Sequence, residues 1–287
     1  MDVSILIVSY NTCKLTLDCL QSVYASETQY SYEVIVIDND SKDDSVRQIE
    51  QCYPQARLIR NEENTGFAKA NNQGMEIAQG RYVLLLNSDT VIQPDTLEIM
   101  LSFMDSRPDV GASGCKVILP DGSLDKACKR GFPTPSASFY YAFGFSKLFP
   151  NNPRFNQYQL GYLSPDEEYE IDCLVGAFML VRKETIDEVG MLDETFFMYA
   201  EDTDWCYRIK QAGWKNYYYP RTTIMHYKRA SSRNEPLRIT YEFHRSMVIF
   251  YNKHYKQKYP FWVSWCIYAG IAVQFALAII KSKLLSR

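Results

Sequence analysis

Runs of apolar residues alternate with helix-like segments along the first part of the chain. The runs at Val3–Ser9, 33–37 and 82–86 lack the polar alternation of a half-exposed strand, which is typical of strands buried on both faces of a parallel sheet. Between them, segments 15–26 and 66–79 carry apolar residues at helical spacing. This alternation predicts an α/β fold with a Rossmann-like, mostly parallel central sheet, flanked by helices and joined by right-handed crossovers.

Polar side chains gather where these predicted strands end. In α/β sheets ligands bind beyond the carboxyl ends of the strands, so these positions predict a binding site along one edge. Asx turns and helix caps explain the same residues, and for Asp38 and Asn39 the two interpretations carry equal weight. The candidate side chains at these ends are Ser9, Asn11, Asp38, Asn39, Asn87, Ser88 and Asp89.

Beyond Pro94 the pattern is less regular. A stretch at 128–164 is rich in Pro, Gly, Asn and aromatic residues, which predicts a long irregular connection of the kind that faces substrates. Strand character returns at 169–182. A further aromatic strand at 214–219 is expected to end at Pro220.

The chain ends in an uncharged apolar segment at 261–280, just long enough to cross a hydrocarbon core. Basic residues flank it on both sides, so charge does not fix its orientation. It either contacts a membrane, by spanning it or lying flat on it, or packs as a buried helix on the domain or on a partner. We expect one domain at 1–235, with halves at 1–110 and 111–235, and a helical, membrane-associating extension at 236–287.

Burying a carboxylate costs free energy unless a cation, a proton or a substrate compensates it. Asp89 follows a buried strand in a position suited to Mg²⁺ or Mn²⁺, which prefer oxygen ligands. Asn87 stands where the first member of an Asp-x-Asp pair would be, so His226 is a candidate for the missing ligand. The alternatives are a helix cap at Asp89 and a purely structural histidine.

A second acidic cluster, Glu201, Asp202 and Asp204, follows an aromatic run. Carboxylates are favoured at the start of a helix, but three exceed what capping requires. A general base placed over an acceptor hydroxyl accounts for the excess. Arg208 lies one turn after Asp204, which indicates a structural ion pair.

Segment 64–74 opens a helix with Asn64, Gly66, Lys69 and Asn72 among its residues. Its backbone N–H groups and Lys69 are suited to a diphosphate, although an ordinary capped surface helix explains them as well. The segment is neither a P-loop nor a GxGxxG motif. The chain also lacks the HExxH, GxSxG and kinase motifs, which leaves those hydrolytic and kinase chemistries without support.

Composition narrows the partners further. The net charge of −3 gives no global basic field, so nucleic acid is not an expected partner. The eight cysteines form no CxxC pair and the first residues do not resemble a signal peptide. Unpaired thiols favour a reducing compartment, so we expect a cytoplasmic protein.

Several segments, taken as an ordered set, resemble family 2 glycosyltransferases of the GT-A fold, and most of all their bacterial rhamnosyltransferase branch. They lie between residues 2 and 230 and are VSILIVSYN, VIDNDSKDDS, NEENTGFAKANNQG, LLLNSD, GAFMLVRKE and FFMYAEDTDWCYRIKQAGW. The resemblance implies an inverting transfer from a nucleoside-diphosphate sugar, with dTDP-rhamnose the favoured donor. The acceptor would be a glycan or a lipid-linked oligosaccharide at the inner face of a bacterial membrane, in cell-surface polysaccharide synthesis such as that of O-antigen.

The resemblance also implies a nucleotide-sugar-binding half at 1–110, an acceptor-binding and catalytic half at 111–235, and roles for particular residues. Asp38 and Asn39 would contact the nucleoside, Asp89 would bind Mg²⁺ or Mn²⁺, Asp202 would be the general base, and His226 would assist at the metal and the diphosphate. Ser231 and Ser232 are expected near phosphate. The remaining substrate- or nucleotide-binding candidates are Ser9, Asn11, Asn64, Gly66, Lys69, Asn72, Asn87, Ser88, Gly176 and Glu201.

Two other classes of function share some of these features. A nucleotidyltransferase of similar fold would use the same sheet, nucleotide site and metal but release pyrophosphate. A non-catalytic module that binds nucleotides or glycans is the other alternative, and Asn87 in place of an aspartate is consistent with it. The acidic cluster at 201–204 favours sugar transfer.

Overall fold

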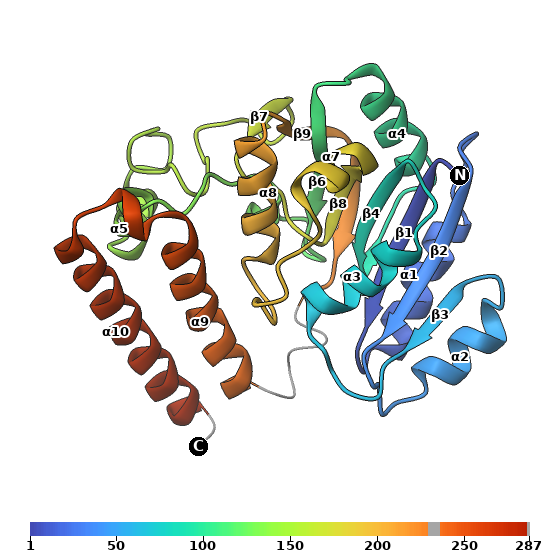
Figure 1. Ribbon diagram of the computed structural model, residues 1–287, viewed down its shortest axis with the longest axis horizontal. Helices are drawn as coiled ribbons and strands as arrows, with labels where there is room; N and C mark the ends of the chain where they lie inside the picture. The colour runs from blue at the N-terminus through green and yellow to red at the C-terminus, as the bar shows by residue number, and fades with distance from the viewer. Residues whose placement is uncertain (229–235, 286–287) are drawn as a thin grey trace.

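The computed structural model describes residues 1–228 and 236–285. Within these residues nine strands form one sheet in the order β3-β2-β1-β4-β8-β6-β9-β5, and β7 pairs with β9 (Figure 1). The strands are β1 (Val3–Ser9), β2 (Tyr32–Asp38), β3 (Arg57–Arg60), β4 (Tyr82–Asn87), β5 (Thr90–Val91), β6 (Val110–Ile118), β7 (Tyr169–Ile171), β8 (Phe178–Arg182) and β9 (Lys215–His226). The α-helices are α1 (Cys13–Tyr24), α2 (Ser45–Cys52), α3 (Phe67–Ile77), α4 (Thr96–Ser106), α5 (Pro135–Ala142), α6 (Phe145–Leu148), α7 (Lys183–Val189), α8 (Glu201–Gln211), α9 (Pro236–His254) and α10 (Phe261–Leu285), and the short 3₁₀ helices are η1 (Lys126–Cys128) and η2 (Lys256–Lys258).

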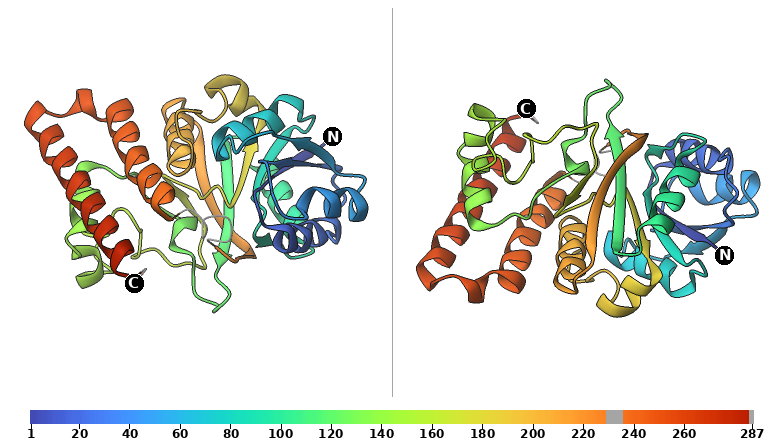
Figure 2. Two further views of the ribbon diagram at one scale, coloured as in Figure 1. Left: turned by 90° about the horizontal axis from the view of Figure 1, so that it is seen from below. Right: turned by 90° about the horizontal axis from the view of Figure 1, so that it is seen from above.

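The amino-terminal half of the sheet is parallel, as predicted. β1 lies between β2 and β4 and runs parallel to both, and β2 runs parallel to β3. Helices α3, α7 and α8 cover one face of the sheet and α1 and α4 the other (Figure 2). The apolar runs are therefore buried on both faces, and the carboxyl ends of β1, β2 and β4 share one edge.

The second half of the sheet is mixed, and two sequence predictions are wrong there. The strand expected at 169–182 is two strands, β7 and β8, and β8 runs antiparallel to β4 and β6. β9 does not end at Pro220 but continues to His226 along β6, with a register irregularity between the pairs Gly114–Tyr218 and Lys116–Thr223. An irregularity of this kind tolerates a proline, which has no N–H to donate to the ladder.

The connection predicted to be irregular, 128–164, contains helices α5 and α6. Helix α5 begins with local signals that the composition obscured. Pro135 occupies the first turn, and the Thr134 hydroxyl accepts a hydrogen bond from the backbone N–H of Ala137. These helices lie at the same end of the molecule as α10 (Figures 1 and 2).

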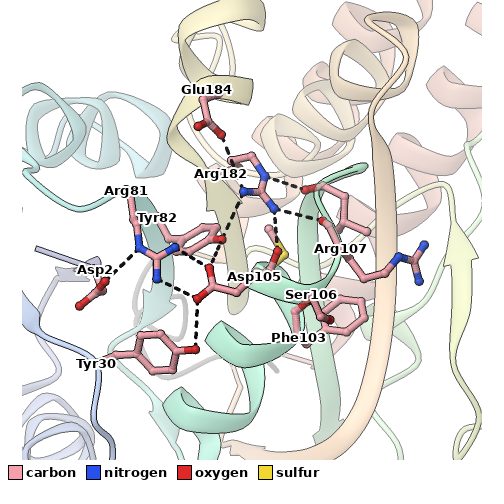
Figure 3. A network of polar contacts seen from close by, with 12 residues as sticks. Asp2, Tyr30, Arg81, Tyr82, Phe103, Asp105, Ser106, Arg107, Arg182 and Glu184 are labelled. Atoms are coloured by element: carbon pink, nitrogen blue, oxygen red, sulfur yellow. Dashed lines mark hydrogen bonds and ion pairs between the residues drawn. The ribbon is translucent and has the colours of Figure 1, made fainter.

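A polar network ties the opposite, amino-terminal edge of the parallel strands together (Figure 3). Asp105, in α4, accepts hydrogen bonds from Arg81 at 2.8 Å, Tyr82 at 2.7 Å and Tyr30 at 3.1 Å. Arg182, at the end of β8, donates to the Tyr82 hydroxyl at 3.2 Å. This network fixes β4 and β8 side by side, which matters because their other ends carry the candidate site.

The extension is a helical hairpin that packs against the domain. A cluster of buried aromatic residues joins α9 to α8 and to the loop before it: Phe196, Tyr207, Phe250, Tyr251 and Tyr255. Helix α10 is the one helix, among those the structure describes, that is long and apolar enough to cross a membrane by length and composition. Only 6% of its apolar window is buried within the protein, so 261–280 is not buried against the domain, and its packing on a partner stays a prediction.

Candidate functional site

A two-residue strand brings the predicted metal ligands together. β5 follows β4 directly and pairs with the last residues of β9, so that Thr90 lies opposite His226. The backbone N–H of Tyr227 donates to the carbonyl of Asp89 at 2.8 Å. As a result Asp89 Oδ1 lies 3.2 Å from His226 Nε2, and the Asn87 amide nitrogen lies 3.3 Å from the same ring nitrogen.

Asp125, which the sequence analysis did not identify, holds the other side of the histidine ring. Its Oδ2 lies 3.3 Å from His226 Nδ1, and its Oδ1 accepts a hydrogen bond from Lys228 at 2.8 Å. Burial disfavours the charged imidazolium, but hydrogen bonds with Asp125 and Asp89 outweigh burial and raise the pKa of His226 to about 9. Burial also acts on Asp125, yet its hydrogen bonds to His226 and Lys228 hold the pKa of this carboxyl well below its usual range.

This arrangement fits a divalent ion that takes two ligands from the protein and the rest from phosphate and water. Asp89 and His226 present an oxygen and a nitrogen at the spacing of neighbouring ligands, and Asp125 orients the ring as carboxylates do behind metal-bound histidines. Among residues 1–228 and 236–285 no group of three acidic, histidine or cysteine side chains could hold a metal by itself. Mg²⁺ and Mn²⁺ accept such sites because phosphate oxygens and water complete their coordination.

The predicted base, Asp202, lies in the first turn of α8 and is 8% exposed. Its Oδ2 accepts hydrogen bonds from Arg130 at 2.8 Å and from the backbone N–H of Gly176 at 3.2 Å. Its Oδ1 accepts the backbone N–H of Thr203 at 2.6 Å. Both oxygens are thus fixed in direction, as the position of a catalytic group requires.

Arg130 is the second residue that sequence reasoning missed. Burial opposes its charge, but the negative charge of Asp202 keeps the pKa of Arg130 well above its usual value. Its guanidinium also donates to the carbonyls of Leu174 at 2.6 Å and Ala127 at 3.0 Å. Arg130 therefore joins the connection at 128–164 to the base, and no local pattern in that connection signals it.

Glu201 lies beside the base with an unpaired carboxylate oxygen. Its Oε2 is buried and has no hydrogen-bond partner among the residues that the structure describes. Burial, and then the negative charge of Asp202, raise the pKa of Glu201 above its usual value. The two residues before it, Tyr199 and Ala200, both have positive φ, of 71° and 64°, which non-glycine residues adopt at a cost in free energy.

Backbone contacts connect the Asp89–His226 pair to Asp202. Antiparallel pairing places the end of β4 beside the start of β8, and the backbone N–H of Asn87 donates to the carbonyl of Ala177 at 3.1 Å. Ala177 follows Gly176, whose N–H contacts Asp202. The Asp89–His226 pair and the Asp202–Arg130 pair therefore lie at the same edge of the sheet, at the junction of β4 and β8.

Asp38 and Asn39 are the predicted nucleoside contacts, and they differ in how far their side chains are already hydrogen-bonded. The Asp38 Oδ1 accepts the N–H of Ser41 at 2.9 Å, whereas its Oδ2 is buried and has no partner within the described part of the chain. Asn39, in contrast, uses its amide within the protein: it donates to the carbonyl of Gly66 at 3.0 Å and accepts from Asn61 at 2.8 Å. A nucleoside N–H or hydroxyl would satisfy the free oxygen of Asp38.

The other predicted binding residues divide into supporting and exposed ones. Asn72 bonds both backbone groups of Leu192, and Asn64 accepts the N–H of Gly66 at 3.0 Å, so both amides hold the loops of the site. Lys69 is exposed on α3. The hydroxyls and amide at the ends of β1 and β4 bond to neighbours, Ser9 with Thr16, Asn11 with Lys42 and Ser88 with Thr12. Ser231 and Ser232 lie outside the described residues.

Proteins similar in sequence to this chain include two rhamnosyltransferases. The sequence model of the family described as "Glycosyl transferase family 2" matches residues 4–190. The N-acetylglucosaminyl-diphospho-decaprenol L-rhamnosyltransferase of Mycobacterium tuberculosis is 27% identical over 91% of this chain and 87% of its own. The rhamnosyltransferase WbbL of Escherichia coli is 27% identical over 81% of this chain and 86% of its own.

Solved structures share the fold at lower identity. A mannosyltransferase of Pyrobaculum calidifontis, solved with GDP-Man and Mn²⁺, is 18% identical with a TM-score of 0.58, over 88% of this chain and 63% of that one. GalNAc-T7, solved with UDP, GalNAc and Mn²⁺, has a TM-score of 0.63 at 16% identity, and the chain covers 48% of it. These likenesses confirm the predicted GT-A fold.

Proposed function

Because the chain belongs to glycosyl transferase family 2, we propose that it transfers a sugar, with inversion, from a nucleoside-diphosphate sugar to a hydroxyl group of an acceptor. The observation that carries this proposal is the junction of β4 and β8. There a pair suited to a diphosphate-bound cation and a carboxylate suited to a base share one edge of the sheet. The similarity to two rhamnosyltransferases supports rhamnose as the sugar and a nucleoside-diphosphate rhamnose such as dTDP-rhamnose as the donor.

The mechanism is a single in-line displacement. The acceptor hydroxyl gives its proton to Asp202 as its oxygen bonds to the anomeric carbon, and the bond from that carbon to the diphosphate oxygen breaks on the opposite face. Arg130 and the Gly176 N–H hold Asp202 in place during this step. A bound Mg²⁺ or Mn²⁺, held by Asp89 and His226, would supply positive charge for the departing diphosphate.

The acceptor and the place of the reaction are further parts of the proposal. One relative is named for a diphospho-decaprenol acceptor, and the apolar α10 is exposed. Both support a lipid-linked acceptor and a cytoplasmic enzyme on the inner face of a bacterial membrane. The division into a nucleotide-binding half at 1–110 and an acceptor-binding half at 111–235 belongs to the same proposal, because Asp38 and Asp89 lie in the first and Asp202 in the second.

A thermal-shift panel of nucleotide sugars, with and without Mn²⁺, tests this function. A true donor at a hundred times its dissociation constant should stabilise the folded chain by about 2.7 kcal/mol, whereas non-ligands should not. Asp89→Ala should remove the Mn²⁺-dependent part of the stabilisation. The exposed Asp95→Ala variant is the matched control and should behave like the parent protein.

Product analysis completes the test. With a stabilising donor and an acceptor, release of a nucleoside diphosphate supports sugar transfer. Release of pyrophosphate when a nucleoside triphosphate and a sugar phosphate replace the nucleotide sugar would identify a nucleotidyltransferase, and binding without turnover would identify a binding module. An unchanged Mn²⁺ dependence in Asp89→Ala would refute the metal site.

A further inference from the structure

Helix α10 is apolar on nearly all sides; its polar Ser264 and Tyr268 face α9 together with the apolar Phe275, and an apolar stripe faces the surroundings. Ser264 is 7% exposed and lies 2.8 Å from the Tyr251 hydroxyl, and Tyr268 donates to Asn252 at 2.6 Å. The large residues of the opposite stripe are each more than half exposed. They are Phe261, Trp262, Trp265, Val273, Leu277 and Ile280. A helix of a soluble protein shows the reverse pattern, so this stripe requires an apolar partner.

The packing of α9 against α10 determines how such a partner can lie. The helices run antiparallel, with Tyr251 beside Tyr268 near one end and Tyr241 beside Phe275 farther along (Figure 1). α9 carries Arg238, Glu242 and Arg245, and it is fixed to α8. If α10 crossed a bilayer in this arrangement, α9 would enter the hydrocarbon with its charges, at about 2.5–3.5 kcal/mol for each basic residue.

The charges around α10 suit a membrane surface. The exposed Lys256 and Lys258 precede the helix and the exposed Lys281 follows its apolar stripe. Cations at both ends match a helix whose two ends lie at the same level, among anionic headgroups. Trp262 and Trp265 are of the residue type that favours the boundary between headgroups and acyl chains.

A second exposed aromatic cluster lies at the same end of the molecule. Helices α5 and α6 lie near α10 (Figure 2), and they and the residues beside them expose large side chains while some of their rings pack against one another. The exposed members are Phe139, Tyr141, Phe143, Leu148 and Phe149. Two apolar clusters at one end favour a broad surface as the partner.

We propose that α10 lies flat in the surface of an anionic bilayer, with its Trp262–Ile280 stripe immersed and α9 on the protein side, and that it does not cross the membrane. This inference deepens the proposed function and rests on it only in that the acceptor is lipid-linked. It assigns the membrane contact to one named stripe and gives it an orientation.

Depth measurements on the full chain test the orientation. Quenching by brominated lipids in phosphatidylglycerol-containing vesicles reports the depth of a tryptophan, and no donor or acceptor is needed. The two probe chains carry Trp265→Phe, one retaining Trp262 and the other with Trp262→Phe and Val273→Trp. A flat helix places both probes at the same shallow depth, about 5–10 Å into the headgroup and acyl boundary. A probe at position 273 near the bilayer centre, about 15 Å deep, would overturn the proposal.

Vesicle co-sedimentation tests the stripe itself. Trp265→Glu with Leu277→Glu should weaken binding by about tenfold or more, because two charges enter the immersed face. Gln21→Glu with Gln51→Glu adds the same charge on exposed positions of α1 and α2 and should bind like the parent chain. If the parent chain ignores vesicles but forms a dimer that the stripe variant loses, a second copy covers the stripe and the proposal fails. Loss of sugar transfer alone changes neither measurement, so the two proposals fail separately.

Discussion

Each residue predicted to take part in the chemistry is held by a second residue far away in the sequence. Arg130 lies 72 positions from Asp202, and Asp125 lies 101 positions from His226. The sequence indicated Asp89, Asp202 and His226 as candidates, because a carboxylate or a histidine at the end of an apolar run is a local signal. It could not identify Arg130 or Asp125, since their roles arise only when the chain folds.

The first prediction concerns the base. Asp202→Asn should lower kcat by about 10²- to 10⁴-fold, because an amide cannot take the proton from the acceptor hydroxyl. The donor dissociation constant, measured by titration calorimetry, should stay within a few-fold of the parent value. Glu201→Gln is the matched comparison: it alters the neighbouring buried carboxyl and should cost less activity. A larger loss in Glu201→Gln than in Asp202→Asn would assign the base to Glu201.

At the scale of elements, the sequence predicted best where the signal was continuous. β1, β2, β4 and α3 lie close to their expected positions because buried parallel strands and amphipathic helices have strong periodicity. β5 was missed because two residues carry no periodicity, yet it sets the distance between Asp89 and His226. The direction of β8 depends on its pairing with β4, which no local pattern contains.

The start of α3 and the loop before α8 meet without spare room. Gly66 has φ of 85°, and a Cβ at this position would lie 2.4 Å from the carbonyl oxygen of Phe197. The N–H of Phe67 donates to the same oxygen at 2.8 Å. This contact holds segment 64–74, the predicted diphosphate-binding segment, against the aromatic run that precedes Asp202.

The second prediction follows from this contact. Gly66→Ala should lower the free energy of unfolding, measured in urea, by about 3 kcal/mol or more, because it combines backbone strain with overpacking. Gly122→Ala is the matched control, since its φ of 80° is similar but nothing lies within 4 Å of the added Cβ. The control should lose only about 1 kcal/mol. Equal losses in the two variants would show that the contact with Phe197 is unimportant.

At the scale of the whole molecule, a buried carboxylate attaches the extension to the catalytic domain. Asp204 is fully buried; its Oδ1 lies 2.7 Å from His254 Nε2 and 2.8 Å from Lys253 Nζ, and its Oδ2 lies 2.9 Å from Arg208. The sequence predicted only the Arg208 pair. Burial opposes ionisation, but the hydrogen bonds from His254 and Lys253 hold the pKa of Asp204 below its usual value.

The third prediction concerns this anchor. Asp204→Asn should lower the free energy of unfolding near pH 7 by about 3 kcal/mol, because it removes the charge of a fully buried carboxylate that accepts from Arg208, Lys253 and His254. A lowered pKa in the folded state means that the stabilisation is present above about pH 4 and is lost as the pH falls through the folded value. Urea unfolding at several pH values should therefore show parent and variant converging in acid.

The exposed pair of Asp187 with Lys183 provides the control. Asp187→Asn should change the free energy of unfolding by about 0.5 kcal/mol or less at every pH, since surface ion pairs contribute little. A pH-independent difference for Asp204→Asn would mean that packing, and not charge, attaches α9 to α8.

The anchor at Asp204 has a geometric consequence if α10 lies flat in the membrane surface. Because Asp204 lies in the same helix as Asp202, the reaction centre cannot rise or sink independently of the leaflet. In such an enzyme Asp202 stays at one fixed distance from the membrane surface. A growing glycan that is tethered to a lipid has its terminal sugar at that distance at only one stage of growth. The anchor between α8 and α9 would then select acceptors by their length.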